Sequence, residues 1–114
     1  MFFTFRRSKK QCFLSTFPKE NIHFIVGDVC ITLLEKNNLP DKISLLRLDT
    51  DWYKSTKTEM EILYPLLSNK GVLIVDDYGH WRGSKQAVDE YFSGQNIDIK
   101  TIDYTGIKII KNEL

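Results

Sequence analysis

The sequence has few of the features that mark a membrane, zinc-binding or nucleic-acid-binding protein. No apolar run approaches the roughly 18 residues that a membrane-spanning helix needs. The two cysteines, Cys12 and Cys30, stand alone, without the CxxC spacing of a zinc site or redox motif. The formal charge of the 114 residues is only +1, which gives little attraction to nucleic acid. We therefore expect a cytoplasmic protein whose partners include neither a membrane nor a nucleic acid.

The chain does contain an alternation of strand-like and helix-like segments. Strand patterns cover residues 21–29, 42–49 and 71–77, and helix patterns cover residues 29–38, 55–64 and 83–94. Two further strand patterns meet at Thr105-Gly106, so we expect an antiparallel hairpin there. This alternation predicts one α/β domain over residues 1–114, mostly parallel with a C-terminal antiparallel hairpin. Residues 1–17 match no pattern and are expected to be irregular.

The helix pattern over residues 55–64 carries recognisable start and stop signals. Ser55 or Thr56 can cap the helix, and Glu59 follows Thr56 at the spacing of a capping box. Pro65 should end or kink this helix, because a proline inside a helix removes a backbone hydrogen bond. In the later helix pattern, Ser84 is the expected cap.

Aspartates follow two of the predicted strands, with Asp49 and Asp51 after the first and Asp76 and Asp77 after the second. The carboxyl ends of neighbouring parallel strands form one edge of a sheet, where ligands usually bind. Three carboxylates that converge there repel one another unless a cation lies between them, and Mg²⁺ prefers such oxygen ligands. The pattern therefore predicts a site for Mg²⁺ or another divalent cation. An alternative stays open, since an aspartate such as Asp51 can simply cap the helix that follows.

The stretch "LLRLDTDWYKSTKTEMEILYPLLSNKGVLIVDDYGHWRGSKQAVDEYF" resembles the macrocin-type (TylF-type) O-methyltransferases of sugar and antibiotic tailoring. The resemblance extends from Pro18 to about Phe92. It implies a Rossmann-like class I methyltransferase fold with S-adenosyl-L-methionine (SAM) and Mg²⁺ as cofactors. It also implies that the acceptor is a hydroxyl group of a sugar or a similar natural product.

The resemblance assigns roles to the aspartates. Asp49, Asp76 and Asp77 match the metal ligands of the family, and Asp51 matches its proposed general base. Thr50 stands where the family usually has glycine. A metal-bound hydroxyl has a lowered pKa, so a nearby carboxylate can take its proton as methyl transfer begins.

Other positions that the resemblance implicates have a second interpretation. Gly27 and Asp28 match the end of a strand near the SAM adenine, so these two residues and Asp49 are the expected cofactor-binding residues. A turn explains Gly27-Asp28 equally well. Three residues of the loop after Asp77 are candidates for lining a substrate mouth or for packing onto the next helix: Tyr78, Trp81 and Arg82.

The sequence lacks the glycine-rich loop with which methyltransferases of this fold begin. The resemblance therefore implies the C-terminal part of the fold, without its first two strands. One edge of the strand over residues 42–49 would then be open, which favours association with a second copy.

Two other functions remain open. One is a non-catalytic remnant that binds a metal or a partner chain. The other is a Mg²⁺-dependent phosphohydrolase that uses Asp49 as nucleophile and Asp51 as acid, although Tyr53 stands where such loops have threonine.

Overall fold

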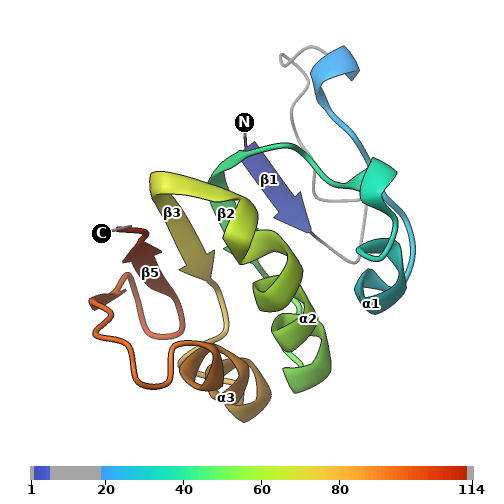
Figure 1. Ribbon diagram of the computed structural model, residues 1–114. Helices are drawn as coiled ribbons and strands as arrows, with labels where there is room; N and C mark the ends of the chain where they lie inside the picture. The colour runs from blue at the N-terminus through green and yellow to red at the C-terminus, as the bar shows by residue number, and fades with distance from the viewer. Residues whose placement is uncertain (1, 6–18, 113–114) are drawn as a thin grey trace.

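In residues 2–5 and 19–112, which the computed structural model describes, five strands form one sheet in the order β1-β2-β3-β5-β4 (Figure 1). The strands are β1 (Phe2–Phe5), β2 (Ile43–Leu48), β3 (Leu67–Val75), β4 (Ile99–Thr101) and β5 (Ile107–Ile110). Neighbouring strands among β1, β2 and β3 pair in parallel, whereas β5 is antiparallel to both β3 and β4. The predicted mostly parallel sheet with a C-terminal antiparallel hairpin is confirmed.

The α-helices are α1 (Val29–Thr32), α2 (Tyr53–Leu63) and α3 (Arg82–Tyr91), with short 3-10 segments at Lys19–Asn21, Lys36–Asn38 and Tyr64–Leu66. In Figure 1, α2 lies in front of β2, and α3 lies beside the lower end of α2. Alternating strand residues meet the inner faces of these helices and form the core: Leu46, Leu48, Leu73, Val75, Ile107, Ile109, Met60, Leu63 and Val88. None of the described helices is long and apolar enough to cross a membrane.

The strand expected over residues 21–29 is wrong. The structure has no strand between residues 22 and 27, and Phe24 and Val26 are 56% and 70% exposed. A strand needs a neighbour with free backbone groups, and β2 is already paired with β1 on one side and β3 on the other. The helix expected over residues 29–38 is shorter, because α1 is followed by the separate 3-10 turn Lys36–Asn38.

The N-terminus also differs from the expectation of irregular structure. Residues Phe2–Phe5 form β1, whose partners in β2 run from Leu45 to Leu48. The edge of β2 that was expected to be open is therefore covered. The sheet edges in the described part of the chain are β1 and β4. The remaining residues of the expected irregular segment, 6–17, lie outside the described residues.

The predicted capping box at the start of α2 is wrong. The helix begins at Tyr53, and its N-cap is Trp52, three to four residues before the expected caps. The Ser55 hydroxyl instead donates to the carbonyls of Thr50 and Trp52, at 3.2 and 3.1 Å. The end of the helix agrees with the prediction, because α2 stops at Leu63 and Pro65 lies in the 3-10 turn that follows.

Helix α3 likewise begins earlier than expected, with Trp81 rather than Ser84 at its N-cap. Its first turn packs closely on the first turn of α2 at Gly83. A Cβ atom at Gly83 would lie 2.6 Å from the backbone nitrogen of Tyr53, so only glycine permits this approach. Farther along, the Tyr53 hydroxyl donates to Glu90 at 2.5 Å. The N-termini of α2 and α3 are thereby held next to each other.

Candidate metal centre

Three aspartates converge beyond the carboxyl ends of β2 and β3. Asp49, Asp51 and Asp77 each offer a carboxylate oxygen, and these oxygens all lie within 4.8 Å of one another. Asp49 directly follows β2, and Asp77 follows β3 by two residues, so the parallel pairing of the two strands brings them together. All three residues are half-buried. We call Asp49, Asp51 and Asp77 the aspartate triad.

The carboxylates of the triad repel one another. Hydrogen bonding to Asp51 is the main cause that raises the pKa of Asp77 to about 7, and burial and the charges of Asp51 and Asp49 add to it. Burial also raises the pKa of Asp49, with a contribution from Asp76, against the opposing effect of the Arg47 guanidinium. A divalent cation would relieve this repulsion. The half-buried, oxygen-only donor set suits a hard cation such as Mg²⁺, which also needs room for water or substrate oxygens.

Asp51 owes its place in the triad to an unusual backbone conformation. Its φ angle is +64°, and the Trp52 amide donates to the Thr50 carbonyl at 2.6 Å across it. This hydrogen bond from residue i+2 to residue i defines a γ-turn, and γ-turns with positive φ are rare and strained. Backbone strain of this kind is concentrated at functional sites. The γ-turn aims Asp51 back at the ends of the strands.

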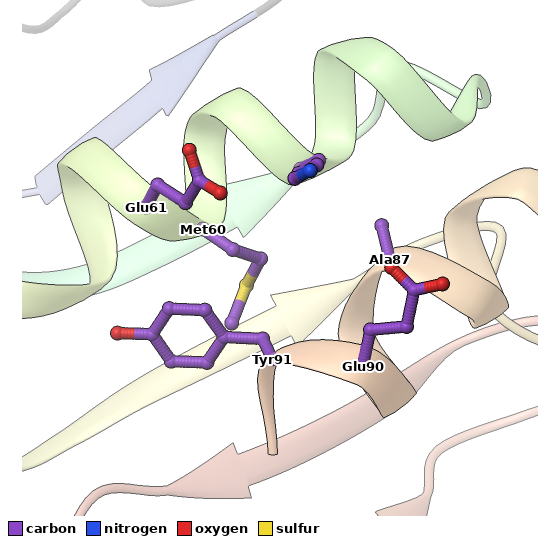
Figure 2. Close-up of a pocket in the computed structure, with 6 residues that line it drawn as sticks. Met60, Glu61, Ala87, Glu90 and Tyr91 are labelled. Carbon is purple, nitrogen blue, oxygen red and sulfur yellow. The ribbon is translucent and has the colours of Figure 1, made fainter. Parts of the chain in front are cut away.

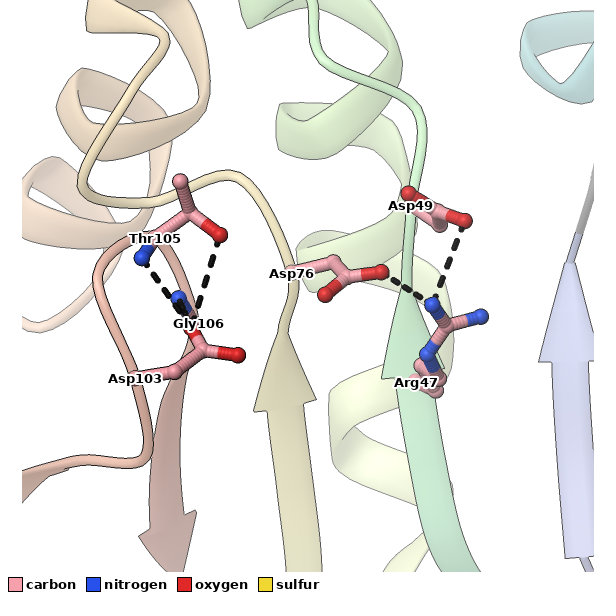
Figure 3. Close-up of polar contacts among 6 residues, drawn as sticks. All are labelled: Arg47, Asp49, Asp76, Asp103, Thr105 and Gly106. Atoms are coloured by element: carbon pink, nitrogen blue, oxygen red, sulfur yellow. Dashed lines mark hydrogen bonds and ion pairs between the residues drawn. The ribbon is translucent and has the colours of Figure 1, made fainter.

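Asp76, which was expected to be a metal ligand, has a different partner. Its carboxylate accepts a short hydrogen bond from the Arg47 guanidinium, which also lies 3.4 Å from Asp49 (Figure 3). Leu48 and Val75 are paired and buried on the helix side, so the alternation of side chains places Arg47 and Asp76 toward the other face. Of the four predicted aspartates, the structure therefore brings three together and leaves Asp76 with Arg47.

A fourth carboxyl group lies close to the triad. Glu59 of α2 is fully buried, and one of its oxygens accepts a hydrogen bond from the Thr50 hydroxyl. Burial raises the pKa of Glu59 to about 8 despite that hydrogen bond, and the charge of Asp49 adds to the rise. Sequence reasoning assigned Glu59 to a capping box and did not foresee a buried carboxyl group next to the triad. Its helical spacing could have indicated burial, because Thr56, Glu59 and Met60 lie on the same buried face of α2.

The residues expected to hold the SAM adenine lie at the start of α1. Asp28 is its N-cap, and its carboxylate accepts a hydrogen bond from the Cys30 amide at 2.9 Å. Gly27 has a φ of +141°, and a Cβ atom there would lie 2.9 Å from the Thr32 methyl carbon. The turn that was the alternative interpretation is therefore present. Both residues are exposed, and the described contacts do not bring them to the triad.

The loop after Asp77 is fixed from two sides. The Tyr78 hydroxyl donates to Asp89 of α3 at 2.6 Å, which is the packing role weighed for this residue. The Gly79 amide donates to the Thr105 carbonyl of the β4–β5 turn at 2.8 Å. That turn is itself braced by Asp103, whose carboxylate accepts from the backbone of Thr105 and Gly106 (Figure 3).

A pocket of about 240 Å³ lies elsewhere, between α2 and α3 (Figure 2). Its lining consists of Lys57, Met60, Glu61, Ala87, Glu90 and Tyr91. It contains none of the predicted site residues. Because the strained backbone and the mutually repelling carboxylates are at the strand ends, we place the candidate site at the triad rather than in this pocket.

The mostly parallel sheet, its C-terminal antiparallel hairpin and the carboxylates at the strand ends are consistent with a Rossmann-like methyltransferase fold. Comparison of the sequence with known families agrees. The chain belongs to the macrocin-O-methyltransferase (TylF) family, whose sequence profile matches residues 14–111.

Two curated relatives cover the same share of the chain. Demethyldecarbamoylnovobiocin O-methyltransferase of Streptomyces niveus is 41% identical over an alignment of 78 residues, and the match covers 63% of this chain and 30% of that protein. The 8-demethyl-8-(2,3-dimethoxy-alpha-L-rhamnosyl)-tetracenomycin-C 4'-O-methyltransferase of Streptomyces olivaceus is 37% identical over 78 residues, with the same coverage. The chain therefore spans about 30% of the length of these relatives.

Solved structures agree with this assignment. The O-methyltransferase NovP matches with a TM-score of 0.62 and 37% identity over 64% of this chain and 31% of its own. CalS11, a calicheamicin methyltransferase, matches with a TM-score of 0.66 over 78% of this chain and 37% of its own. At 20% identity, the match to CalS11 shows the fold alone.

Proposed function

We propose that the chain is the metal-binding part of a SAM-dependent O-methyltransferase that acts on a hydroxyl group of a sugar or a similar natural product. The observation that carries this proposal is the convergence of Asp49, Asp51 and Asp77 at the strand ends of a TylF-family chain. Metal, general base and acceptor hydroxyl must lie within a few ångströms of one another for this chemistry. The triad offers the protein groups for such a site within 4.8 Å.

Each aspartate of the triad has its own role in the proposed reaction. Asp49 and Asp77 would hold Mg²⁺ or another divalent cation, which when bound lowers the pKa of the acceptor hydroxyl. Asp51 accepts the hydroxyl proton, since its carboxylate adjoins both ligands and is the one placed by the strained turn. SAM, when bound, supplies the methyl group. Arg47 holds Asp76 and orients Asp49 from the other face of the sheet.

Gly27 and Asp28 remain the proposed contacts to the SAM adenine, and Asp49 remains a proposed cofactor-binding residue. Support for this role comes from the family match and from the exposure of both residues. One oxygen of Asp28 already accepts a hydrogen bond from the Cys30 amide, and the carboxylate has further acceptor sites for an adenine amino group.

The name of one relative supports a sugar hydroxyl as the acceptor. The Streptomyces olivaceus relative is named for a rhamnosyl tetracenomycin. A 6-deoxyhexose glycoside is therefore the first acceptor to test.

The test is a methyl-transfer assay on the purified chain with SAM, Mg²⁺ and methyl α-L-rhamnopyranoside. Formation of S-adenosylhomocysteine and the methylated glycoside, lost in Asp51→Asn, is the result we expect. Metal binding without methyl transfer would instead favour a remnant that binds metal or a partner chain. Hydrolysis of p-nitrophenyl phosphate would favour the phosphohydrolase alternative. Sedimentation velocity in the same buffer would show whether the sheet edges β1 and β4 support association.

A further inference from the structure

The two tryptophans of the chain, Trp52 and Trp81, lie against each other on the surface. Their ring centroids are 5.7 Å apart and their planes are tilted by 46°. Trp52 is 53% exposed and Trp81 is 39% exposed. Tryptophan is usually much more buried, since its ring is the largest apolar side chain. Exposed apolar side chains that gather in one place are a common feature of binding sites.

Both tryptophans are tied to the loops that carry the aspartate triad. Trp52 directly follows Asp51, and its amide closes the γ-turn by donating to the Thr50 carbonyl. The Trp81 amide donates to the Asp77 carbonyl at 2.9 Å. Each residue is also the N-cap of its helix, and the close approach at Gly83 sets those two N-termini side by side. The two loops that carry the triad therefore also position the aromatic pair.

The Trp81 ring is held on another side as well. The His80 ring meets it edge to face, with centroids 4.9 Å apart and an interplanar angle of 88°. Aromatic contacts of this geometry stabilise a ring beyond the effect of the apolar area that they bury. Trp81 thus has two aromatic neighbours that fix its orientation while more than a third of its surface stays open.

We propose that Trp52 and Trp81 form an aromatic platform on which the pyranose ring of the acceptor stacks while its hydroxyl reaches Asp51. This inference rests on the function proposed above. A hydroxyl that gives its proton to Asp51 must come within about 3 Å of that carboxylate. The sugar ring that bears this hydroxyl then lies within reach of the Trp52 indole, because Trp52 directly follows Asp51. A pyranose presents a face of C–H groups that packs on an aromatic ring, and its hydroxyl groups remain free for polar partners.

The experiment uses the fact that the chain has only two tryptophans. A ¹H–¹⁵N spectrum of the whole chain therefore contains two indole N–H signals, both from the platform. Methyl α-L-rhamnopyranoside is titrated in the presence of Mg²⁺, and both indole signals are expected to shift and to saturate. Trp81→Ala should weaken the apparent affinity at least about fivefold, whereas Trp81→Phe, which keeps a flat ring, should retain most of it. Tyr104→Ala is the matched control, because Tyr104 is exposed but belongs to another loop.

Failure of the platform can be told apart from failure of the metal site. Mn²⁺ added in a separate titration should broaden both indole signals if it binds at the triad. Indole signals that Mn²⁺ broadens but the glycoside never shifts would overturn the platform and leave the metal site intact. Signals that shift with S-adenosylhomocysteine and not with the glycoside would also overturn it, since the pair would then contact the cofactor. Signals that shift with the glycoside but ignore Mn²⁺ would support the platform and contradict the metal site.

Discussion

The Thr50 hydroxyl donates a hydrogen bond to the buried carboxyl of Glu59, and this contact joins helix α2 to the turn between Asp49 and Asp51. The second oxygen of Glu59 has no hydrogen-bond partner in the described part of the chain. With a pKa of about 8, Glu59 is mainly protonated at neutral pH. The triad therefore lies next to a buried acid that is mainly uncharged at neutral pH.

Stability should depend on pH through Glu59. The folded state keeps this proton up to about pH 8, whereas the unfolded chain releases it near 4.5, so protonation favours folding. The stabilisation is complete below pH 4.5 and is lost as the pH rises to 8, by up to about 1.4 kcal/mol per pH unit. Urea unfolding at pH 5.5 and 8 should show this fall, and Glu59→Gln should reduce it. Equal slopes in the two proteins would mean that Glu59 is ionised in the fold.

Substitutions of Thr50 should distinguish the contribution of its hydroxyl group to stability from the contribution of its side-chain volume. Thr50→Val keeps the volume but leaves the Glu59 carboxyl without its donor, so we expect a loss of about 1–3 kcal/mol of unfolding free energy. Thr50→Ser keeps the hydroxyl and should lose less. The comparison is made by urea unfolding at pH 6, where Glu59 is protonated. A serine variant as unstable as the valine variant would assign the effect to packing.

Metal binding should release a proton from the triad. The pKa of Asp77 is about 7, so part of the population carries a proton there at neutral pH, and a cation must displace it. The apparent affinity for Mn²⁺ should therefore rise between pH 6 and pH 8. Calorimetry in two buffers of different ionisation enthalpy at pH 6.5 should report proton release. Binding heats that are the same in both buffers would show that no proton leaves.

The approach of α2 and α3 should not tolerate a larger residue at Gly83. Alanine normally favours a helix over glycine by about 1 kcal/mol. At Gly83, however, the added methyl group would meet the Tyr53 backbone at 2.6 Å, and relieving such overpacking costs about 1–3 kcal/mol. We expect Gly83→Ala to be destabilised in urea unfolding, whereas Gln86→Ala, an exposed site on the same helix, should change little. A stabilised Gly83→Ala would show that the helices can move apart freely.

Hydrophobic patterns predicted the centre of the sheet well and its edge poorly. Residues 42–49 and 71–77 are strands because their apolar side chains are needed in the core, and β2 and β3 contain most of each segment. Residues 21–29 have a similar composition, but a pattern does not tell which strand will be the neighbour. In the fold Phe2–Phe5 lies beside β2, and residues 22–27 have no strand partner.

The aspartates illustrate the same limit at the level of side chains. Their position beyond strand ends was evident from the sequence, and three of the four converge. The spacing of the aspartates along the sequence does not tell which three of them converge. The positive φ of Asp51 aims its carboxylate into the site, and the guanidinium of Arg47 draws Asp76 to the other face of the sheet. The metal and base roles of these residues stay predictions.

The central claim is that Asp49 and Asp77 hold a divalent cation next to Asp51. The most direct test is a Mn²⁺ titration, followed by electron paramagnetic resonance of the free ion, on the chain and its four Asp→Asn variants. The account predicts one site per chain, weakened about tenfold or more in Asp49→Asn and Asp77→Asn, whereas Asp51→Asn, which alters the proposed base, should bind Mn²⁺ more nearly as the unaltered chain does. Asp76→Asn should lose less, because the charge of Asp76 is already paired with Arg47. No binding by the unaltered chain, or a loss in Asp76→Asn as large as in Asp77→Asn, would contradict it.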